Sequence, residues 1–383
     1  CPTRAMLMTG RYPQRSGVNH WTQGNLKAKS GINMALEEVT LAEVLQGAGY
    51  RTALFGKWHL GAAATHGPTK QGFDEFFGHR GGFIDNYNHH FLHQKGFHDL
   101  YRGTEEQFAE GKYFPDLAVK EALRFLDENQ KSPFFLFLPF NIPHYPEQSD
   151  AKFDDRYRHM PMPRQSYAKA ISTTDDRMGQ IMAKIDKLGL TDNTIFVFMS
   201  DNGHSAEDYQ ISVDNHKSGL AKGTNYGANG GGGNTGKWRG NKATFFEGGI
   251  RVPAMISYPA KLPKGKVRDQ ALSATDILPT ILELCDVPLP DTQLDGQSLL
   301  SIIKSPDAVS HHEAMHWQWN KNWADREGDW KLIAAGNNLF LGNLADEEPE
   351  AINHAPDQPE IVERLTALHE AWANEVQPKN ASK

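Results

Sequence analysis

Residues 134–146, FFLFLPFNIPHYP, contain the pattern that decides the fold: a short apolar run that passes directly into a polar segment. The run at 134–140 shows no alternation of polar and apolar residues, which is typical of a parallel strand buried on both faces. In NIPHYP, His144 lies between two prolines that stiffen the backbone. The segment therefore predicts a buried strand with a histidine just beyond its carboxyl end.

The same order of apolar strand and polar motif occurs at two other places. Residues 50–55 (YRTALF) predict a strand that leads into GKWHLG, and residues 194–199 (TIFVFM) predict one that leads into SDNGH. In parallel sheets, ligands bind beyond the carboxyl ends of the strands. We therefore expect the three polar motifs to lie close together in the fold, although they are far apart in the sequence.

A helical pattern precedes each of these strands. Residues 41–46 follow a capping box formed by Thr40 and Glu43. The other two helices show apolar residues on one face. These positions are Val119, Ala122, Leu123 and Leu126 in one helix, and Met178, Ile181, Met182, Ile185 and Leu188, before Gly189, in the other. This alternation predicts an α/β fold in which helices sandwich a large, mostly parallel sheet.

The pattern changes at about residue 310. Before it, residues 226–240 are too rich in glycine for a helix or strand, and VPAMIS at 252–257 predicts a return to the sheet. After it come two short strands, DWKLIA and NLFLGNL, and a helix. The apolar face of that helix consists of Ile361, Leu365, Leu368 and Trp372. The sequence therefore predicts an α/β catalytic domain at 1–309 and a small C-terminal α+β subdomain at 310–383, with a short antiparallel sheet and a helix.

The composition excludes several classes of protein. A chain of 383 residues with 39% hydrophobic content can bury a large core, and a net charge of -7 argues against nucleic-acid binding. No apolar run is long enough to cross a bilayer. The two cysteines, Cys1 and Cys285, are too few for a disulfide framework, and Cys285 ends the apolar stretch ILPTILELC, which predicts a packing role.

Two segments carry a resemblance to a known family. CPTRAMLMTGRYP at 1–13 resembles the signature of type I, formylglycine-dependent sulfatases of the alkaline phosphatase superfamily, in which a Cys or Ser precedes x-P-x-R and a TG pair. GKWRGNKATFFEGGIRVP at 236–253 is similar to the last active-site loop of that family. Pro2 and Arg4 fit the signature only if the nucleophile immediately precedes Cys1. The resemblance thus implies that the numbered sequence lacks the nucleophile and the first strand, and that this fragment is inactive.

The resemblance implies hydrolysis of sulfate esters, with the site spread over the motifs. The residues to which it implies catalytic roles are Arg4, Lys57, His59, His144 and Lys242, and those that would bind substrate are Lys57, His144, Lys242, His204 and Trp238. A lysine offers a fixed positive charge to a sulfate oxygen, and a histidine handles protons near neutral pH. Taken singly, KWH or a lysine in a glycine-rich loop is more typical of solvated surface.

The resemblance also implies a metal site that binds one Ca²⁺. Asp201 and Asn202 in SDNGH offer the hard oxygen ligands that calcium prefers, and the turn at Gly203 aims them at one ion. Further Asp ligands and the formylglycine would lie upstream of Cys1. By itself, DNG is usually a simple turn. Glu247 to Arg251 are expected to form a structural turn.

The substrate is less well defined. One set of aromatic side chains has two interpretations, a rim that packs against sugar rings or part of the buried core. Its members are Trp317, Trp319, Trp323, Phe83, Tyr87, His89 and His90. They favour a sulfated carbohydrate; the alternatives are a simple arylsulfatase, a phosphate or phosphonate ester hydrolase of the same superfamily, or a non-catalytic binder of sulfated glycans. The family resemblance further implies a formylglycine-generating or other sulfatase-maturing enzyme as a partner and a periplasmic or secreted location.

Overall fold

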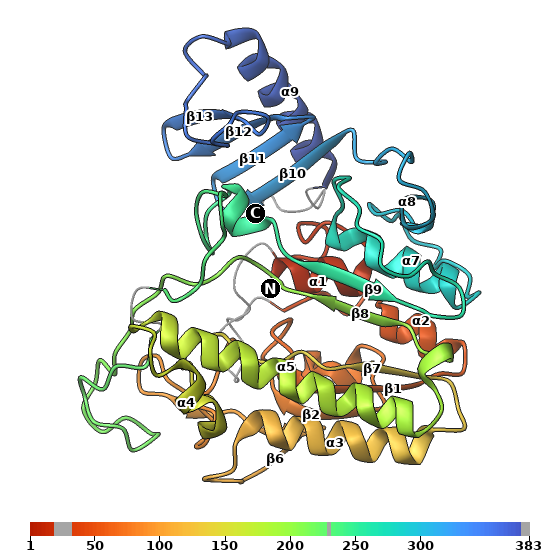
Figure 1. Ribbon diagram of the computed structural model, residues 1–383, viewed down its shortest axis with the longest axis vertical. Helices are drawn as coiled ribbons and strands as arrows, with labels where there is room; N and C mark the ends of the chain where they lie inside the picture. Colours follow the sequence, from red (N-terminus) through yellow and green to blue (C-terminus); the bar gives the residue numbers. More distant parts are fainter. Residues whose placement is uncertain (19–32, 228–230, 377–383) are drawn as a thin grey trace.

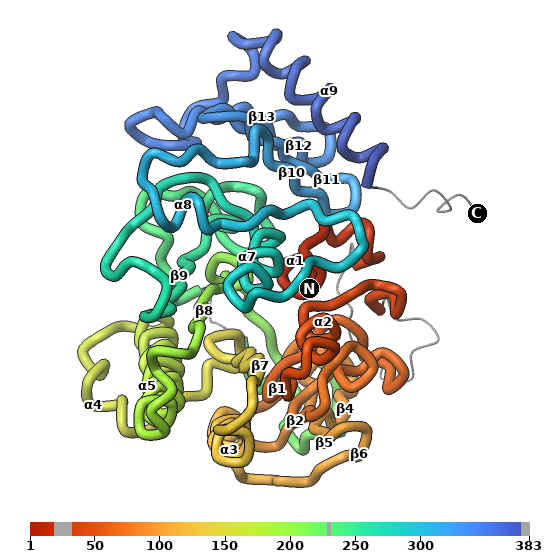
Figure 2. Tube along the Cα trace, turned by 90° about the vertical axis from the view of Figure 1, so that its right-hand side faces the viewer, coloured from red at the N-terminus to blue at the C-terminus, as the bar shows by residue number. Residues whose placement is uncertain are grey.

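Two units of secondary structure make up the part of the chain that the computed structural model describes, which is residues 1–18, 33–227 and 231–376. The larger unit contains a mixed sheet with helices on both sides, and a small antiparallel sheet lies over one end of it (Figure 1). Figure 2, turned by 90°, shows the small sheet over the same end. The boundary at 309/310 between two domains stays a prediction.

The main sheet has five strands in the order β6-β5-β2-β1-β7. Its core is parallel, because β1 pairs in parallel with β2 on one side and with β7 on the other. Two very short strands, β5 and β6, extend the sheet in antiparallel order. The strands are β1 (Arg51–Lys57), β2 (Glu75–His79), β5 (Tyr101–Arg102), β6 (Glu105–Glu106) and β7 (Phe134–Phe137). The predicted α/β class is confirmed, with a sheet that is mixed.

A second pair of strands lies apart from the main sheet. β8 (Phe196–Met199) pairs with β9 (Ala254–Ser257) in antiparallel order. Between β7 and β8 lies a cavity of about 3210 Å³, lined by apolar side chains of both strands. The prediction that 252–257 rejoins the same sheet is therefore wrong, since within the described residues β9 has β8 as its only strand partner. Residues of β7 and β8 are half-buried because they face the cavity.

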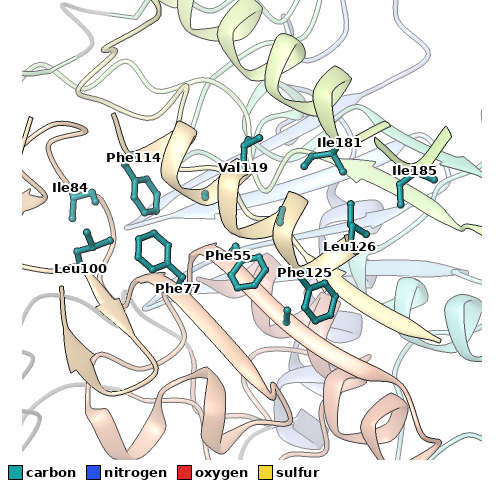
Figure 3. Close-up of a cluster of buried hydrophobic side chains, with 13 residues drawn as sticks. Phe55, Phe77, Ile84, Leu100, Phe114, Val119, Phe125, Leu126, Ile181 and Ile185 are labelled. Carbon is teal, nitrogen blue, oxygen red and sulfur yellow. The ribbon is translucent and has the colours of Figure 1, made fainter. Parts of the chain in front are cut away.

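One face of the main sheet is covered by α3 (Phe114–Asn129) and α5 (Arg164–Lys187). A cluster of buried apolar side chains fills the space between them and the sheet (Figure 3). Predicted core residues in this cluster are Val119, Ala122, Leu126, Ile181 and Ile185. Met182 is an exception, because it is 55% exposed and lines the cavity beside β8.

The opposite side carries α1 (Pro2–Thr9), α2 (Leu41–Gly47) and α7 (Ile277–Leu284), which pack together. The predicted capping box is confirmed: the Glu43 N–H donates to Thr40 Oγ1 at 3.1 Å, and the Thr40 N–H donates to Glu43 Oε2 at 2.8 Å. Cys285 ends α7 and packs against the apolar cluster of α2 and α7, as predicted, and burial raises the pKa of its thiol.

The C-terminal unit is an antiparallel sheet in the order β10-β11-β12-β13, with one helix packed on it. Its elements are β10 (Ala314–Trp319), β11 (Asn322–Glu327), β12 (Trp330–Ala335), β13 (Asn338–Asn343) and α9 (Pro359–Val376). Leu332, Leu341 and Leu365 form its core. The predicted short sheet and helix are confirmed for the described residues, which exclude 377–383.

Several short elements connect these units. They are β3 (His90–Phe91), β4 (Phe97–His98), α4 (Asp154–Tyr157), α6 (Glu247–Ile250), α8 (Leu300–Lys304) and the 3₁₀ turns at Ala64–His66, Pro68–Lys70, Ala151–Phe153, Thr191–Asn193 and Ala274–Asp276. The described part of 226–240 contains neither helix nor strand, as predicted, and residues 228–230 lie outside the description. Within the described ranges, every helix is too short or too polar to cross a bilayer.

Candidate active site

The three polar motifs meet at one end of the cavity between β7 and β8. Every site residue predicted from the sequence lines this cavity: Arg4, Lys57, His59, His144, Asp201, Asn202, His204, Trp238 and Lys242. Each motif follows a strand, so the expected convergence at the carboxyl ends of β1, β7 and β8 is what the structure has. The start of α1 and the loop before α6 complete the group.

Arg4 holds two of the motifs together. Its Nη1 donates to the Lys57 carbonyl oxygen at 2.8 Å, and its Nε lies 3.5 Å from Asp201 Oδ2. Thr3 Oγ1 also donates to the Asp201 carbonyl oxygen at 2.6 Å. The first turn of α1 is therefore bonded both to the end of β1 and to the loop after β8.

Lys57 is a buried cation beside another cation. Burial and the nearby Arg4 guanidinium lower the pKa of Lys57 to about 7, although Asp201 acts in the opposite direction. An anion that enters the cavity would stabilise the charged form of Lys57, because it offsets the free-energy cost of removing the ammonium from water. The site is thus locally electropositive in a protein of net negative charge.

Lys242 links the glycine-rich loop to the other two motifs. Its Nζ lies 2.7 Å from Glu207 Oε2 and 3.2 Å from His144 Nε2. His144 Nδ1 lies 2.8 Å from the Tyr145 carbonyl oxygen, so Nδ1 carries the proton and Nε2 accepts from Lys242. Burial and the charges of Lys242 and Lys57 hold the pKa of His144 well below its usual value. His144 is therefore neutral at physiological pH.

His59 follows the end of β1 and lines the same cavity. Its backbone has a φ of 58°, an uncommon conformation that turns the chain sharply after β1, and its N–H donates to the Arg80 carbonyl oxygen at 3.1 Å. Burial, Lys57 and Arg4 hold the pKa of His59 well below its usual value. The imidazole is therefore neutral, and the neighbouring cations disfavour its protonation unless an anion offsets their charge.

Glycines allow the loop after β8 to approach the turn at α6. A Cβ on Gly203 would lie 1.8 Å from the Gly248 carbonyl oxygen, so a larger residue is excluded. The Gly203 N–H donates to the Gly249 carbonyl oxygen at 2.9 Å, and the Lys242 N–H donates to the His204 carbonyl oxygen at 2.9 Å. These backbone contacts hold Lys242 beside the SDNGH motif.

Asp201 and Asn202 fit the predicted cation site in part. Burial would raise the pKa of the Asp201 carboxyl, but Arg4 and Lys57 outweigh it and hold the pKa far below its usual value. Asn202 Nδ2 donates to the Gly203 carbonyl oxygen at 2.8 Å, so its side-chain oxygen is the atom with the chemistry of a cation ligand. Carboxylate and amide oxygens suit calcium, which takes about six to eight ligands. The two residues therefore offer oxygen atoms of the right type for part of such a shell.

A second group with metal-ligating atoms lies elsewhere. Among the described residues, Asp276, His311 and His312 are the one set of three such side chains whose ligand atoms lie within 4.8 Å of one another. Both imidazoles contact the Asp276 carboxylate, at 2.9 Å. Because calcium prefers oxygen to imidazole nitrogen, this set is not the predicted calcium site.

The predicted aromatic rim is correct only in part. Trp317 and Trp319 line the cavity, whereas Trp323 stacks on His369 inside the C-terminal unit. Phe83 also lines the cavity, where its largely buried ring stacks on that of His144 with the centroids 5.3 Å apart. His89 is buried and bonds the Lys112 carbonyl oxygen. The remaining rim residues, Tyr87 and His90, pack against Tyr113 and His98 and do not line the cavity.

Sequence reasoning missed Glu207, which is bonded to Lys242, and the aromatic residues around it. The stretch SDNGHSAEDY contains both Glu207 and Tyr209 only a few residues after the metal motif, so the signal was present. Trp238 and His204 also line the cavity, and the Arg251 guanidinium covers the Trp238 ring at 4.0 Å from its centroid.

Comparison with known families and proteins gives consistent matches. The Sulfatase family model matches residues 1–287, and the model for N-sulphoglucosamine sulphohydrolase, C-terminal, matches residues 236–372. Human arylsulfatase A is 31% identical over 328 residues, which cover 80% of this chain and 59% of that protein. Steryl-sulfatase of Rattus norvegicus is 28% identical over 384 residues, which cover 82% of this chain and 63% of that protein. The chain thus spans less than two thirds of the length of these relatives.

A solved structure resembles the whole described fold. Ps i-CgsB in complex with k-i-k-neocarrahexaose superposes with a TM-score of 0.79 at 27% identity, covering 98% of this chain and 82% of that one. A second, from work on glycosaminoglycan metabolism by Bacteroides thetaiotaomicron, has a TM-score of 0.74 at 24% identity, covers 97% of this chain and 88% of that one, and bears on the fold alone.

Proposed function

Because the chain belongs to the sulfatase family, we propose that it hydrolyses sulfate esters. The observation that carries the proposal is the set of three cations, Arg4, Lys57 and Lys242, around one end of an otherwise largely apolar cavity. Such an arrangement binds a tetrahedral anion and stabilises charge that develops on it during transfer. No positively charged surface elsewhere is needed to explain how a protein of net charge -7 binds an anion.

The proposed nucleophile is a formylglycine bonded to the nitrogen of Cys1. That nitrogen is buried among the charges of Asp201, Lys57, Arg4 and Lys242, so a residue attached to it would lie inside the site. When present, a hydrated formylglycine supplies a hydroxyl that attacks sulfur. Lys57 and Lys242 would bind sulfate oxygens and orient the ester for that attack. His59 is neutral at physiological pH and would take up a proton at an imidazole nitrogen once a bound sulfate offsets the neighbouring cations.

His144 is proposed to act on the side of the leaving group through its hydrogen bond with Lys242. Its Nε2 accepts from Lys242 Nζ, so the two side chains form one donor–acceptor pair at the cavity wall. When a substrate oxygen replaces His144 as the acceptor for Lys242, the ammonium can stabilise the negative charge on the departing oxygen. The bond of His144 Nδ1 to Tyr145 keeps the imidazole oriented throughout.

Asp201 and Asn202 are proposed to hold part of a Ca²⁺ site. A bound Ca²⁺ would supply positive charge at the sulfate, and the two residues provide the type of oxygen ligand that it prefers. Asp201 Oδ2 lies 3.5 Å from Arg4 Nε, and the low pKa of this carboxyl keeps it charged, as a cation ligand must be. Further Asp ligands are expected upstream of Cys1.

A strand that fills the cavity between β7 and β8 is part of the same proposal. Among the described residues, each of these strands has a partner on one side only. A strand between them would join the two sheets, and it would bury the half-exposed side chains of Phe134–Phe137 and Phe196–Met199. A protein that includes the residues preceding Cys1 should therefore show slower amide hydrogen exchange in β7 and β8. Equal exchange with and without them would contradict this part.

A sulfated carbohydrate is the substrate class that we favour over an aryl sulfate. Trp317 and Trp319 offer aromatic faces on the cavity wall, where sugar rings pack well. The similar Ps i-CgsB was solved with a saccharide ligand, and dog N-acetylgalactosamine-6-sulfatase is 28% identical over 366 residues. No observation on this chain favours a phosphate or phosphonate ester.

The decisive experiment measures free sulfate released by the complete, matured protein. The substrates are sulfated glycans and 4-nitrophenyl sulfate, each with calcium and with chelator, and the presence of formylglycine is checked by peptide mass. Release that chelator abolishes is the expected result. No release with formylglycine confirmed would contradict the proposal, and release of phosphate from a phosphate ester instead would support the rival hydrolase. The same mass measurement tests for a maturing enzyme, and cell fractionation tests a periplasmic or secreted location.

A further inference from the structure

A carboxylate stands directly beside the proposed sulfate-binding lysine. Glu207 Oε2 is 2.7 Å from Lys242 Nζ, and its side chain is 26% exposed toward the cavity. A sulfate oxygen bound to the same ammonium would lie about 2.8 Å from Nζ. Glu207 and the sulfate group would therefore be neighbours, each bonded to one cation.

Local hydrogen bonds hold Glu207 in this position. Ser205 Oγ donates to Glu207 Oε2 at 2.7 Å, and the Glu207 N–H donates to Ser205 Oγ at 3.2 Å. Lys242 and these bonds also hold the pKa of the Glu207 carboxyl below its usual value, against the effect of burial. The group is thus a fixed negative charge that can only accept hydrogen bonds.

Aromatic rings flank this carboxylate on the cavity side. Tyr209 is 38% exposed, and its ring centroid is 4.8 Å from that of His93 and 5.5 Å from that of Tyr145. His93, Tyr145 and Tyr209 all line the cavity. A fixed hydrogen-bond acceptor beside exposed ring faces suits a sugar, which presents hydroxyl donors at its edge and C–H groups on its face.

We propose that Glu207, Tyr209 and His93 form a subsite for the sugar ring, in which Glu207 accepts a hydrogen bond from a free hydroxyl on the carbon next to the sulfate ester. The same carboxylate would repel a second sulfate or a carboxylate at that carbon. The inference rests on the proposed function and narrows its substrate to sugars with a hydroxyl beside the ester. It assigns to Glu207 a role in specificity, separate from sulfate binding.

The test compares pairs of substrates with the complete, matured protein and Glu207→Gln. The pairs are monosulfates of galactose and of N-acetylglucosamine with a free adjacent hydroxyl, each against the disulfate with its second sulfate on that adjacent carbon; 4-nitrophenyl sulfate serves as a reference without hydroxyls. The natural protein should prefer the monosulfate by about tenfold or more in kcat/KM. Glu207→Gln should lower this ratio to about threefold or less, because the amide keeps the shape but lacks the charge.

The ratio separates specificity from a general effect on Lys242. Loss of the Glu207 charge changes Lys242 for all substrates alike, so it moves every rate together and leaves the ratio unchanged. Glu121→Gln, which alters a carboxylate paired with Arg102 far from the site, is the matched control and should change nothing. Tyr209→Leu should raise KM for the sugars but not for 4-nitrophenyl sulfate.

Two results would overturn the subsite. One is an unchanged ratio in Glu207→Gln; the other is turnover of 4-nitrophenyl sulfate with none of the sugars. Both leave sulfate-ester hydrolysis standing, although the second also contradicts the proposed carbohydrate substrate. Failure of that function appears differently, as absence of sulfate release from every substrate, including the aryl sulfate, by protein with formylglycine confirmed.

Discussion

Two clusters of charged side chains in this molecule differ in what surrounds them. In the first, Lys331 Nζ lies 2.9 Å from Glu247 Oε1 and 2.9 Å from Glu350 Oε1, and the Glu247 N–H donates to Glu350 Oε2 at 2.8 Å. The side chains of Lys331 and Glu350 are fully buried. This cluster joins α6 of the larger unit to the C-terminal sheet. We call it the closed cluster.

The second cluster, which we call the open cluster, comprises Arg4, Lys57, Asp201, Glu207 and Lys242 and faces the cavity. Burial, together with the nearby Arg4 guanidinium, lowers the pKa of Lys57 to about 7. In the closed cluster, burial would raise the pKa of Glu247, but Lys331 and Arg251 keep it below its usual value. In the closed cluster, the opposite charges pair with one another and stabilise the fold. In the open cluster, cations face a cavity, so an anionic ligand can pair with them.

Lys331→Ala should give the largest effect, because it leaves Glu350 buried without its cation and removes one of the cations that pair with buried Glu247, which keeps Arg251. We expect a loss of about 3–5 kcal/mol in the free energy of unfolding. Denaturant titration measures it, with exposed Lys120→Ala as the control. A loss below about 1 kcal/mol would mean that the closed cluster does not differ from surface pairs.

Lys242→Ala in the open cluster should damage function and spare stability. Loss of a cation that stabilises the transferring group lowers kcat by about 10²–10³-fold, or about 2.7–4 kcal/mol. Sulfate release measures the first effect and the unfolding midpoint the second. The control is Lys222→Ala, an exposed lysine of the loop between β8 and β9. Wild-type turnover would remove Lys242 from the proposed site.

His312→Ala tests a third group, in which two imidazoles contact the buried Asp276 between the larger unit and the segment that leads into β10. Hydrogen bonds to a charged group contribute about 1.5–3 kcal/mol, so we expect a loss of stability near that size, partly offset by His311. Thermal unfolding measures it. If the double variant His311→Ala/His312→Ala is as stable as the natural chain, this contact does not stabilise the fold as the closed cluster does.

The smallest effect should come from titrating Lys57. Below pH 7 its ammonium is charged and binds anions; as the pH rises through about 7, the charged fraction falls, and sulfate binding to the free site should weaken by up to about tenfold per pH unit. His59 and His144 do not share this range, since their pKa values lie well below their usual values. Sulfate inhibition constants across pH 5.5–8.5 measure the change.

Lys57→Arg is the matched variant, because a guanidinium stays charged throughout that range. Its sulfate binding should lose the step near pH 7. If sulfate binding to Lys57→Arg still weakens near pH 7, the titrating group is another residue, and Lys57 does not explain the pH dependence of the open cluster.

Local signals in the sequence were sufficient for much of the fold. The capping box of Thr40 and Glu43, the apolar faces of α3 and α5 and the polar motifs after three strands each depend on residues close together in the chain. Because each polar motif follows a strand, the predicted site residues line one cavity at the ends of those strands. The aromatic rim was less predictable, because Trp317 and Trp323 are the same residue type six positions apart, and only packing places Trp317 at the cavity and Trp323 against His369.

The sequence by itself determined the α/β pattern, the family resemblance and which residue types follow each strand, because backbone propensity and strand order act over short distances. Only the tertiary structure decided that β8 and β9 pair apart from the main sheet, that Glu207 bonds Lys242, and that Glu247 bonds Lys331 instead of a ligand. These outcomes depend on contacts between segments many residues apart, and the strength of each charge pair depends on how completely the fold excludes water from it.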